Sequence, residues 1–271
     1  MTAPIPAIPI PPPTPPSGGE LLVENISRSF GGLTALKDFS FTVRPGELVA
    51  LIGPNGAGKT TAFNVVTGVY PPTAGEIRLA GRRIDGLPPA DLCHAGIART
   101  FQNIRLFPTL SVLENVSVAI RRPAGQGLFR TILQTPGFLR AQARTEQEAI
   151  ELLGTLGLAH KSDLRADSLP YGDQRRLEIA RALATRPKIL LLDEPAAGMN
   201  PQEKVELTAL IKFLRDHFGV GIWLIEHDMK LVMSICQRIT VLDHGETIAI
   251  GAPDEVCNNP KVIEAYLGEP G

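Results

Sequence analysis

The feature that most constrains this chain is a short apolar run that leads directly into a glycine-rich segment. Residues 48–52 are all apolar, as expected of a strand that is covered on both faces of a parallel sheet. The next eight residues, Gly53 to Thr60, fit the pattern G-x-x-x-x-G-K-[ST], and a helix-like stretch follows them. A strand, a glycine-rich loop and a helix in this order predict an α/β fold with an anion-binding loop.

The residues of this loop suit a triphosphate. Glycines let consecutive backbone N–H groups turn inward, and the following helix adds its positive dipole end. Lys59 brings a cation to the β- and γ-phosphates, and the Thr60 hydroxyl suits Mg²⁺. The alternative is a tight glycine turn that binds nothing, and the flanking strand and the Lys-Thr pair argue against it. The predicted nucleotide-binding residues are Gly53, Pro54, Asn55, Gly56, Ala57, Gly58, Lys59, Thr60 and Thr61.

Two further apolar runs end in charged residues. Residues 189–192 precede Asp193 and Glu194, and residues 221–225 precede Glu226 and His227. Open α/β sheets place their ligand sites at the carboxyl ends of such strands. We expect Asp193 to hold Mg²⁺, directly or through water, and Glu194 to polarise the attacking water. Alone, a strand that ends in Asp-Glu is weak evidence for a nucleotide site. A phosphate loop earlier in the same chain makes that evidence strong.

The segment between the first two apolar runs has helical signals. Ser111 and Glu114 predict a capping box that starts a helix through Ile120. Ala149, Ile150, Leu152, Leu153 and Leu156 have the spacing of an amphipathic helix, and residues 172–184 also have helical character. Alternating strands are expected at residues 21–26 and 39–43. These signals predict a helical lobe inserted into an α/β core.

Composition excludes several other classes of protein. The 27 basic and 28 acidic side chains leave a net charge of -1, which argues against a nucleic-acid partner. Cys93, Cys236 and Cys257 are too scattered for a metal site or a disulfide framework. No run approaches the roughly 18 apolar residues that span a bilayer, and no signal peptide is expected at the proline-rich start of the chain.

A further motif makes a family resemblance specific. Residues 168–176 (Ser-Leu-Pro-Tyr-Gly-Asp-Gln-Arg-Arg) precede a predicted helix. Together with the phosphate loop, they resemble the nucleotide-binding subunit of an ABC transporter, whose signature is commonly L-S-G-G-Q. The resemblance implies that Pro170, Gly172 and Gln174 of one subunit complete the ATP site of another in a head-to-tail dimer. Pro170 stands where the family has a serine that bonds the γ-phosphate, which predicts weakened contacts across the dimer.

The other motifs of the family occur in the expected order over residues 20–270. Phe30 matches the aromatic residue that stacks on adenine, although tyrosine is usual there. Gln102 matches the Q-loop glutamine, which contacts the metal or its water, and residues 197–201 match the D-loop. His227 matches the switch histidine that contacts the γ-phosphate. The resemblance implies ATP and Mg²⁺ as cofactors, with Thr60, Gln102 and Asp193 at the metal and Lys59, Gln102, Glu194 and His227 in catalysis.

The resemblance also implies an architecture. We expect a P-loop NTPase (RecA-like) core with an antiparallel β subdomain and an inserted α-helical subdomain. Residues 20–101 and 186–251 would form the core with its β subdomain, and residues 102–185 the helical subdomain. Residues 1–19 would be a disordered proline-rich tail and residues 252–271 a C-terminal helical tail.

Three segments are most similar to the ATPase subunit of branched-chain (hydrophobic) amino acid importers: the insertion before the signature, the signature helix and the C-terminal residues. That resemblance implies ATP hydrolysis on the cytoplasmic face of the inner membrane. The expected partners are a second copy or a paralogous ATPase, two transmembrane permease subunits and, indirectly, a periplasmic or extracellular substrate-binding protein, without nucleic acid. Alternatives are a urea or amide importer, a lipopolysaccharide exporter, a non-transport ABC ATPase, and a nucleotide-gated module without turnover.

Two surface features leave alternatives open. Residues 115–145 contain no acidic residue, and their arginines flank an apolar patch, Leu128, Phe129, Ile132 and Leu133. This segment suits either a solvated insertion or contact with anionic lipid headgroups. Phe107, which follows the Q-loop, suits either docking of a permease or an ordinary place in the core.

Overall fold

The computed structural model describes residues 19–120 and 136–267. Its centre is a six-stranded sheet in which β3 (Leu48–Ile52) lies between β9 and β8. Five neighbouring strands are parallel, and β10 pairs antiparallel with β9 at one edge. The other strands of this sheet are β6 (Ile97–Arg99), β7 (Ile189–Asp193), β8 (Gly221–Ile225), β9 (Arg238–Asp243) and β10 (Glu246–Gly251).

Both faces of the sheet are covered, which explains its continuous apolar strands. Leu48, Ala50 and Ile52 belong to one hydrophobic core, and Val49 and Leu51 belong to another, because successive side chains of a strand point to opposite faces. The first core includes residues of α6 (Tyr171–Ala184), α7 (Pro201–Phe218) and α8 (Met229–Ile235). The strands expected at residues 48–52, 189–192 and 221–225 are confirmed.

The second core lies between this sheet, α1 (Lys59–Val66), α2 (Pro89–Ala95) and an antiparallel sheet in the order β2-β1-β4-β5. Trp223 of β8 joins these layers, since its ring centroid is 4.1 Å from that of Phe41 and 4.3 Å from that of Phe63. These contacts pack α1 and β2 against β8 of the central sheet. The antiparallel strands are β1 (Leu21–Phe30), β2 (Leu33–Val43), β4 (Ala74–Leu79) and β5 (Arg82–Arg83).

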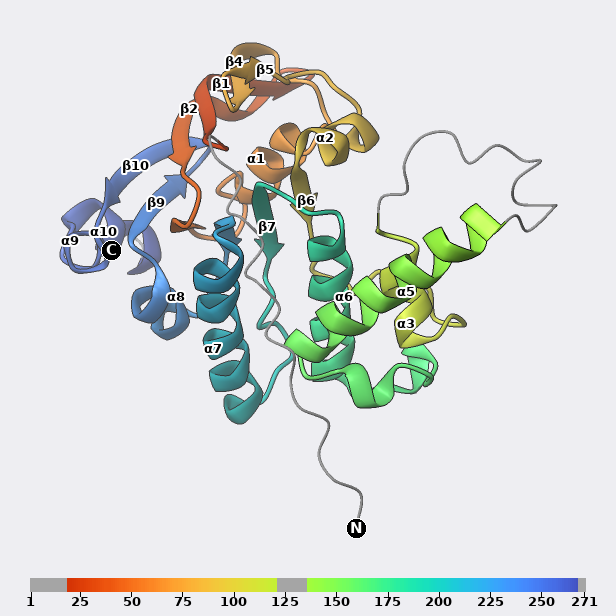
Figure 1. The fold of residues 1–271 in the computed structure, drawn as a ribbon. Coiled ribbons are helices and arrows are strands. Elements are labelled where there is room, and N and C mark those ends of the chain that lie inside the picture. Colours follow the sequence, from red (N-terminus) through yellow and green to blue (C-terminus); the bar gives the residue numbers. More distant parts are fainter. Residues whose placement is uncertain (1–18, 121–135, 268–271) are drawn as a thin grey trace.

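The helices α3 (Val112–Ser117), α5 (Pro136–Thr155) and α6 pack together beside the sheet (Figure 1). The capping box at Ser111 and Glu114 is confirmed, although α3 ends at Ser117 and not at Ile120. The helix over residues 149–155 is also confirmed as part of α5, where Ala149 and Leu153 are buried. Ile150 shares the apolar spacing but is 40% exposed, whereas Ala149, Leu153 and Leu156 are buried.

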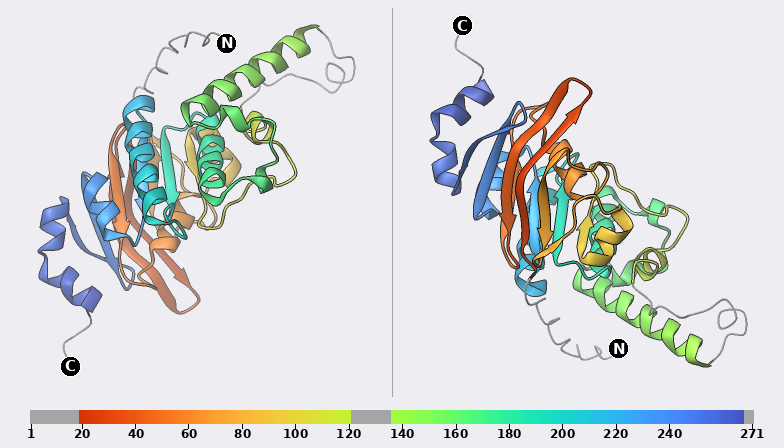
Figure 2. Two further views of the ribbon diagram at one scale, coloured as in Figure 1. Left: turned by 90° about the horizontal axis from the view of Figure 1, so that it is seen from below. Right: turned by 90° about the horizontal axis from the view of Figure 1, so that it is seen from above.

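The N-terminal end of α5 extends away from the rest of the molecule (Figure 2). The C-terminal helices α9 (Pro253–Cys257) and α10 (Pro260–Leu267) lie at the opposite end of the molecule. The predicted combination of an α/β core, an antiparallel sheet and a group of helices is therefore confirmed. Within the described ranges, no helix has the length and apolar content that crossing a bilayer requires.

Several expectations fall outside the described residues. Apart from Gly19, the proline-rich tail does so, and so do the apolar residues Leu128, Phe129, Ile132 and Leu133 with Arg121, Arg122 and Arg130. Arg140 and Arg144 belong to α5, where both side chains are exposed. Both interpretations of the basic segment therefore stay open.

Candidate functional site

The glycine-rich loop leaves β3 at Gly53 and enters α1 at Lys59. Its glycines have positive φ angles of 149° at Gly53, 83° at Gly56 and 99° at Gly58. A Cβ atom at Gly53 would lie 2.1 Å from the carbonyl oxygen of Leu242, and one at Gly58 would lie 2.6 Å from that of Ala35. The loop therefore requires glycine at both positions, for its backbone conformation and for its close packing against β9 and β2.

The Lys59 side chain folds back over this loop. Its Nζ donates hydrogen bonds to the carbonyl oxygens of Gly53 and Pro54, at 2.7 and 2.8 Å. Burial lowers the pKa of the Lys59 ammonium, and the nearby Glu194 carboxylate acts in the opposite direction. Thr60 is exposed in the first turn of α1, where backbone N–H groups lack intrahelical partners. The loop thus presents a cation, a hydroxyl and backbone donors to an anion.

The segments that follow β6, β7 and β8 bring three predicted catalytic residues together. The backbone N–H of Glu194 donates to the carbonyl of Ile225 at 2.9 Å. The Glu194 Oε2 accepts a hydrogen bond from Gln102 Nε2 at 2.8 Å and lies 3.7 Å from His227 Nδ1. Glu194 also has a φ of 44°, a strained value for a residue with a side chain. Strain of this kind is common at active sites, where the surrounding structure holds a side chain in place.

Asp193 has a partner that the sequence analysis missed. Arg99 Nη2, at the end of β6, donates to Asp193 Oδ2 at 2.6 Å, and both side chains are largely buried. Arg99 Nη1 donates to Asn64 Oδ1 of α1 at 2.7 Å. Arg99 therefore joins the phosphate-loop helix to the end of β7 and holds one oxygen of the carboxylate. The sequence feature that could have indicated Arg99 is its position at the end of a short strand, three residues before Gln102.

Glu226 is a second residue that the analysis noted only as the end of a strand. It is buried, and its carboxylate accepts hydrogen bonds from the backbone N–H groups of Ala196, at 2.8 Å, and His227, at 3.1 Å. Glu226 thus ties the segment after Glu194 to the predicted switch residue. The sequence feature that could have indicated the role of Glu226 is a carboxylate directly after a fully apolar strand.

The donor atoms at the strand ends fit Mg²⁺ with a nucleotide. Thr60, Gln102 and Asp193 offer hydroxyl, amide and carboxylate oxygens, which are hard ligands. In the residues that the structure describes, no cluster of three or more His, Cys, Asp or Glu side chains is suited to a metal. Mg²⁺ usually binds through one or two carboxylates together with substrate phosphates and water, so this donor set is adequate once phosphate is present.

Phe30 lies at the end of the β1–β2 hairpin, opposite Leu33. Its side chain is 40% exposed, with the Arg28 guanidinium 4.6 Å from the ring centroid and Tyr70 edge-on at 5.2 Å. The same hairpin contacts the glycine-rich loop, because the Ala35 carbonyl lies against Gly58. An exposed ring beside a phosphate loop suits stacking on a nucleotide base.

The signature segment lies at the start of α6. Pro170 is the exposed N-cap residue and makes no side-chain hydrogen bond, Gly172 is in the first turn, and Gln174 Nε2 donates to the Leu169 carbonyl at 2.8 Å. No hydrogen bond or ion pair between described residues joins residues 170–174 to residues 53–61. The structure therefore brings five predicted residues to the end of the sheet where the parallel strands finish: Lys59, Gln102, Asp193, Glu194 and His227. It leaves the signature residues apart from the phosphate loop.

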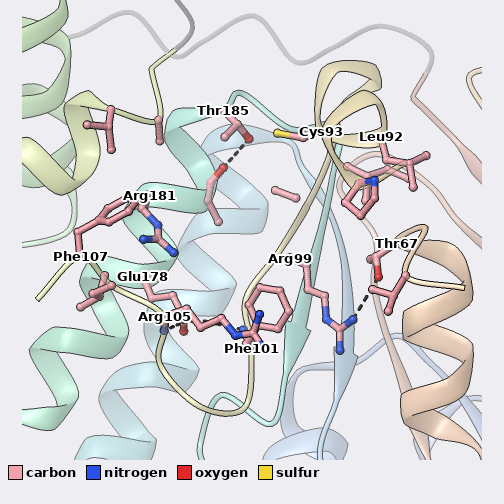
Figure 3. A pocket seen from close by; sticks show the side chains of 18 residues that line it. Thr67, Leu92, Cys93, Arg99, Phe101, Arg105, Phe107, Glu178, Arg181 and Thr185 are labelled. Carbon is pink, nitrogen blue, oxygen red and sulfur yellow. Dashed lines mark hydrogen bonds between the residues drawn. The ribbon is translucent and has the colours of Figure 1, made fainter. Parts of the chain in front are cut away.

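A groove of about 840 Å³ lies between the sheet edge and the helices (Figure 3). Phe107 lines it with a 49% exposed side chain, which excludes the alternative of an ordinary core phenylalanine. The buried Asn115 of α3 fixes the Phe107 backbone, accepting from its N–H at 2.9 Å and donating to its carbonyl at 3.0 Å. Hydrogen bonds thus fix the backbone that presents this ring to the groove.

Comparisons with known proteins bear on this geometry. A family model described as "ABC transporter" matches residues 36–197, more than half of the chain. This chain belongs to the ABC transporter family. A second model, described as "Branched-chain amino acid ATP-binding cassette transporter", matches residues 246–271. As a member of the family, the protein is a nucleotide-binding ATPase.

Several individual proteins are similar over most of the chain. The high-affinity branched-chain amino acid transport ATP-binding protein LivG of Salmonella typhimurium is 51% identical over 92% of this chain and 98% of its own. BraF of Pseudomonas aeruginosa, named for the same transport, is 47% identical over 92% and 98%. The lipopolysaccharide export protein LptB of Escherichia coli is 36% identical over 92% and 97%.

Among solved structures, the ADP conformation of an ATP-binding cassette of an ABC transporter matches with a TM-score of 0.80 and 32% identity. The match covers 93% of this chain and 99% of that one. The fold class expected from the sequence therefore agrees with that of solved cassettes.

Proposed function

We propose that this chain is the ATP-hydrolysing subunit of a branched-chain (hydrophobic) amino acid importer. The observation that carries the proposal is the 51% identity to LivG along 98% of that relative. The 36% identity to LptB makes lipopolysaccharide export the weaker candidate. In this proposal residues 20–101 and 186–251 are the nucleotide-binding core, residues 102–185 the helical subdomain and residues 252–271 a C-terminal tail.

The residues of the site have distinct tasks in hydrolysis. Lys59 and the backbone N–H groups of residues 53–61 hold the phosphates, and Phe30 stacks on the adenine. Glu194 accepts a proton from the attacking water, while Gln102 and His227 lie within reach of the same carboxylate. Thr60, Gln102 and Asp193 would hold Mg²⁺, which would supply charge neutralisation at the phosphates. Arg99 orients the Asp193 carboxylate.

A second subunit completes the site. Pro170, Gly172 and Gln174 are separate from the loop of their own chain, so we assign them to the γ-phosphate of a partner, a second copy or a paralogous ATPase. The first-turn N–H groups and the dipole of α6 favour an anion there. The absence of the family's serine hydroxyl at Pro170 removes one donor and leaves backbone N–H groups to bind the phosphate.

The groove beside Phe107 is our candidate for permease docking. Phe107, Val118 and Val69 are exposed apolar residues of its wall. The guanidinium groups of Arg105 and Arg181 lie over the rings of Phe101 and Phe107, at 4.0 and 5.3 Å (Figure 3). Apolar walls with two arginines suit a short amphipathic helix that carries an acidic residue. Two such permease subunits would hold the chain on the cytoplasmic face of the inner membrane, with a substrate-binding protein on the other side.

Transport assays test the substrate. The chain is expressed with its permeases and binding protein in cells that lack their own branched-chain importer, and uptake of radiolabelled leucine, valine and urea is measured. We expect uptake of leucine and valine that requires Lys59 and Glu194. Uptake of urea without leucine would replace the proposal with the urea or amide alternative.

Co-purification from membranes tests the docking groove. We expect Phe107→Ala to lower the yield of co-purified permease at least fivefold while ATP still binds. Val205→Ala is the matched control, since Val205 is also an exposed apolar residue and lies on α7, outside the groove. An unchanged permease yield with Phe107→Ala would remove the groove from the docking surface.

A further inference from the structure

Two charged residues of α6 are fully buried. Arg175 is 0% exposed and Glu178 is 2% exposed, and Arg175 Nη1 lies 2.7 Å from Glu178 Oε2. Removing two charges from water is costly, and a buried ion pair is often no more stabilising than apolar residues of similar size. The reason for these charges must therefore lie in the groups that they bind.

Both side chains bind the backbone of the Q-loop. Arg175 donates to the carbonyl oxygens of Phe101 and Gln102, at 2.6 and 2.7 Å. Glu178 Oε1 accepts from the N–H groups of Phe101, at 3.4 Å, and Arg105, at 3.2 Å. Residues 101–105 form neither helix nor strand, so α6 side chains supply partners that regular structure would otherwise provide. This segment is thus fastened to α6 by buried, charge-assisted hydrogen bonds.

The Gln102 side chain reaches away from α6 to the core. Its Nε2 donates to Glu194 Oε2 at 2.8 Å. Gln102 is therefore held at its backbone by the helix that carries the signature segment and at its side chain by the predicted catalytic carboxylate. A displacement of α6 relative to β7 must move the Gln102 amide relative to Glu194.

Tyr171 adds a second link from the same network to the core. Its hydroxyl accepts a hydrogen bond from Arg175 Nη2 at 3.3 Å and donates one to the Ala197 carbonyl at 3.0 Å. Ala197 follows Glu194 by three residues, in the segment that matches the D-loop. The buried arginine thus contacts the start of α6, the Q-loop and, through Tyr171, the segment after Glu194.

We propose that Arg175 and Glu178 are positioning residues that transmit the position of α6 to the contact between Gln102 and Glu194. The inference rests on the proposed ATPase mechanism and deepens it. When the signature end of α6 engages a second subunit, the Arg175–Glu178 pair carries the Q-loop backbone with it. Hydrolysis then depends on the placement of the helical subdomain, although neither Arg175 nor Glu178 touches the nucleotide.

Steady-state kinetics of the purified full-length chain test the proposal. We expect Glu178→Gln and Arg175→Met to lower kcat at least tenfold, because the Q-loop backbone loses its fixed position. The KM for ATP and the Kd for nucleotide should stay within twofold, since residues 53–61 and Phe30 are unaffected. Arg175→Lys should recover only part of kcat, because one ammonium cannot bind both carbonyls in a fixed geometry.

An exposed ion pair offers a matched control. Arg186 pairs with Glu148 of α5 at 2.6 Å, with 76% and 37% of the side chains exposed. We expect Arg186→Met to leave kcat within twofold, because a surface pair contributes little. Thermal unfolding shows which variants are folded, and Glu178→Gln, which retains the shape of the side chain, carries the test if Arg175→Met does not fold.

A double-mutant cycle with Gln102→Ala separates positioning from general destabilisation. If the pair acts through Gln102, Glu178→Gln should lower kcat by less than twofold in the Gln102→Ala background. The inference would be overturned if the losses of kcat in the two single variants multiplied in the double variant. An unchanged kcat in Glu178→Gln alone would also overturn it. A wild-type chain without ATPase activity would instead contradict the proposed function, so the two failures are distinguishable.

Discussion

The loop of residues 53–61 and the signature segment of residues 169–174 both precede helices, but their surroundings differ. The loop packs against its own chain, with the carbonyls of Leu242 and Ala35 in close contact with Gly53 and Gly58. The signature segment has an exposed N-cap residue, Pro170, with no side-chain hydrogen bond.

The difference separates two groups of predicted site residues. The loop, Asp193, Glu194, Gln102 and His227 form a connected half-site at one edge of the sheet. The signature half is presented outward at the start of another helix. In the proposed function a second chain completes the site, and the predictions below test each half in turn.

The largest effect is expected from Glu194→Gln in the connected half. The variant retains the hydrogen-bonding shape and loses the base, so kcat should fall at least 100-fold, or about 2.7 kcal/mol. ATP binding and the dimer formed with ATP should persist, as measured by nucleotide retention and size-exclusion chromatography. A kcat within about threefold of wild type, or ~0.65 kcal/mol, would remove Glu194 as the base.

Two glycine variants compare positions within the loop. Gly58→Ala would place a Cβ atom 2.6 Å from the Ala35 carbonyl, whereas no atom lies within 4 Å of a Cβ at Gly56. Both residues have positive φ angles, so the variants share backbone strain and differ in the clash. We expect Gly58→Ala to weaken ATP binding at least tenfold, about 1.4 kcal/mol, and Gly56→Ala to weaken it less. Equal Kd values in calorimetric titration would show that packing against β2 is unimportant.

A smaller effect is expected at the adenine end of the connected half. Phe30→Ala should raise the Kd for ATP about 3- to 10-fold, because an aromatic contact contributes about 0.5–1.5 kcal/mol. Phe30→Tyr is the control and should stay within twofold, since the ring remains. Fluorescence titration with an ATP analogue measures both, and an unchanged Kd in Phe30→Ala would exclude stacking on adenine.

The smallest effect is expected at Pro170 in the signature half. Pro170→Ser supplies a side-chain oxygen that caps α6, which should raise the free energy of unfolding by about 1 kcal/mol. The hydroxyl should also bond the γ-phosphate across the dimer and raise kcat two- to fivefold. Urea unfolding and ATPase assays measure the two effects separately. A stabilised chain with an unchanged kcat would show that the hydroxyl has no role across the dimer.

Local sequence patterns predicted a substantial part of this structure. The apolar runs at residues 48–52 and 221–225 match β3 and β8 in full, and the capping box at Ser111 starts α3. Each of these signals depends on residues that are neighbours in the sequence. The same spacing does not say that Ile150 is exposed, because the packing of α5 decides how wide its buried face is.

The missed residues are charged groups whose partners are distant in the sequence. Arg99 binds Asp193, 94 positions away, and Arg175 binds the carbonyl of Phe101, 74 positions away. Arg175 and Glu178 share a helix face with the buried Ile179, so their burial was predictable from spacing. Their partners were not, because helical spacing does not indicate which loop packs on that face.

The sequence by itself determined the central strands β3, β7 and β8 and the phosphate loop, and it predicted the reacting groups, since apolar periodicity and short motifs are local properties of a chain. The tertiary structure alone decided that Gln102, Glu194 and His227 converge, that Arg99 holds Asp193, and that the signature residues lie apart from the loop. These arrangements depend on the order of strands in the sheet and on how α6 packs beside it. Free energy from non-local burial selects that packing, and no single segment encodes it.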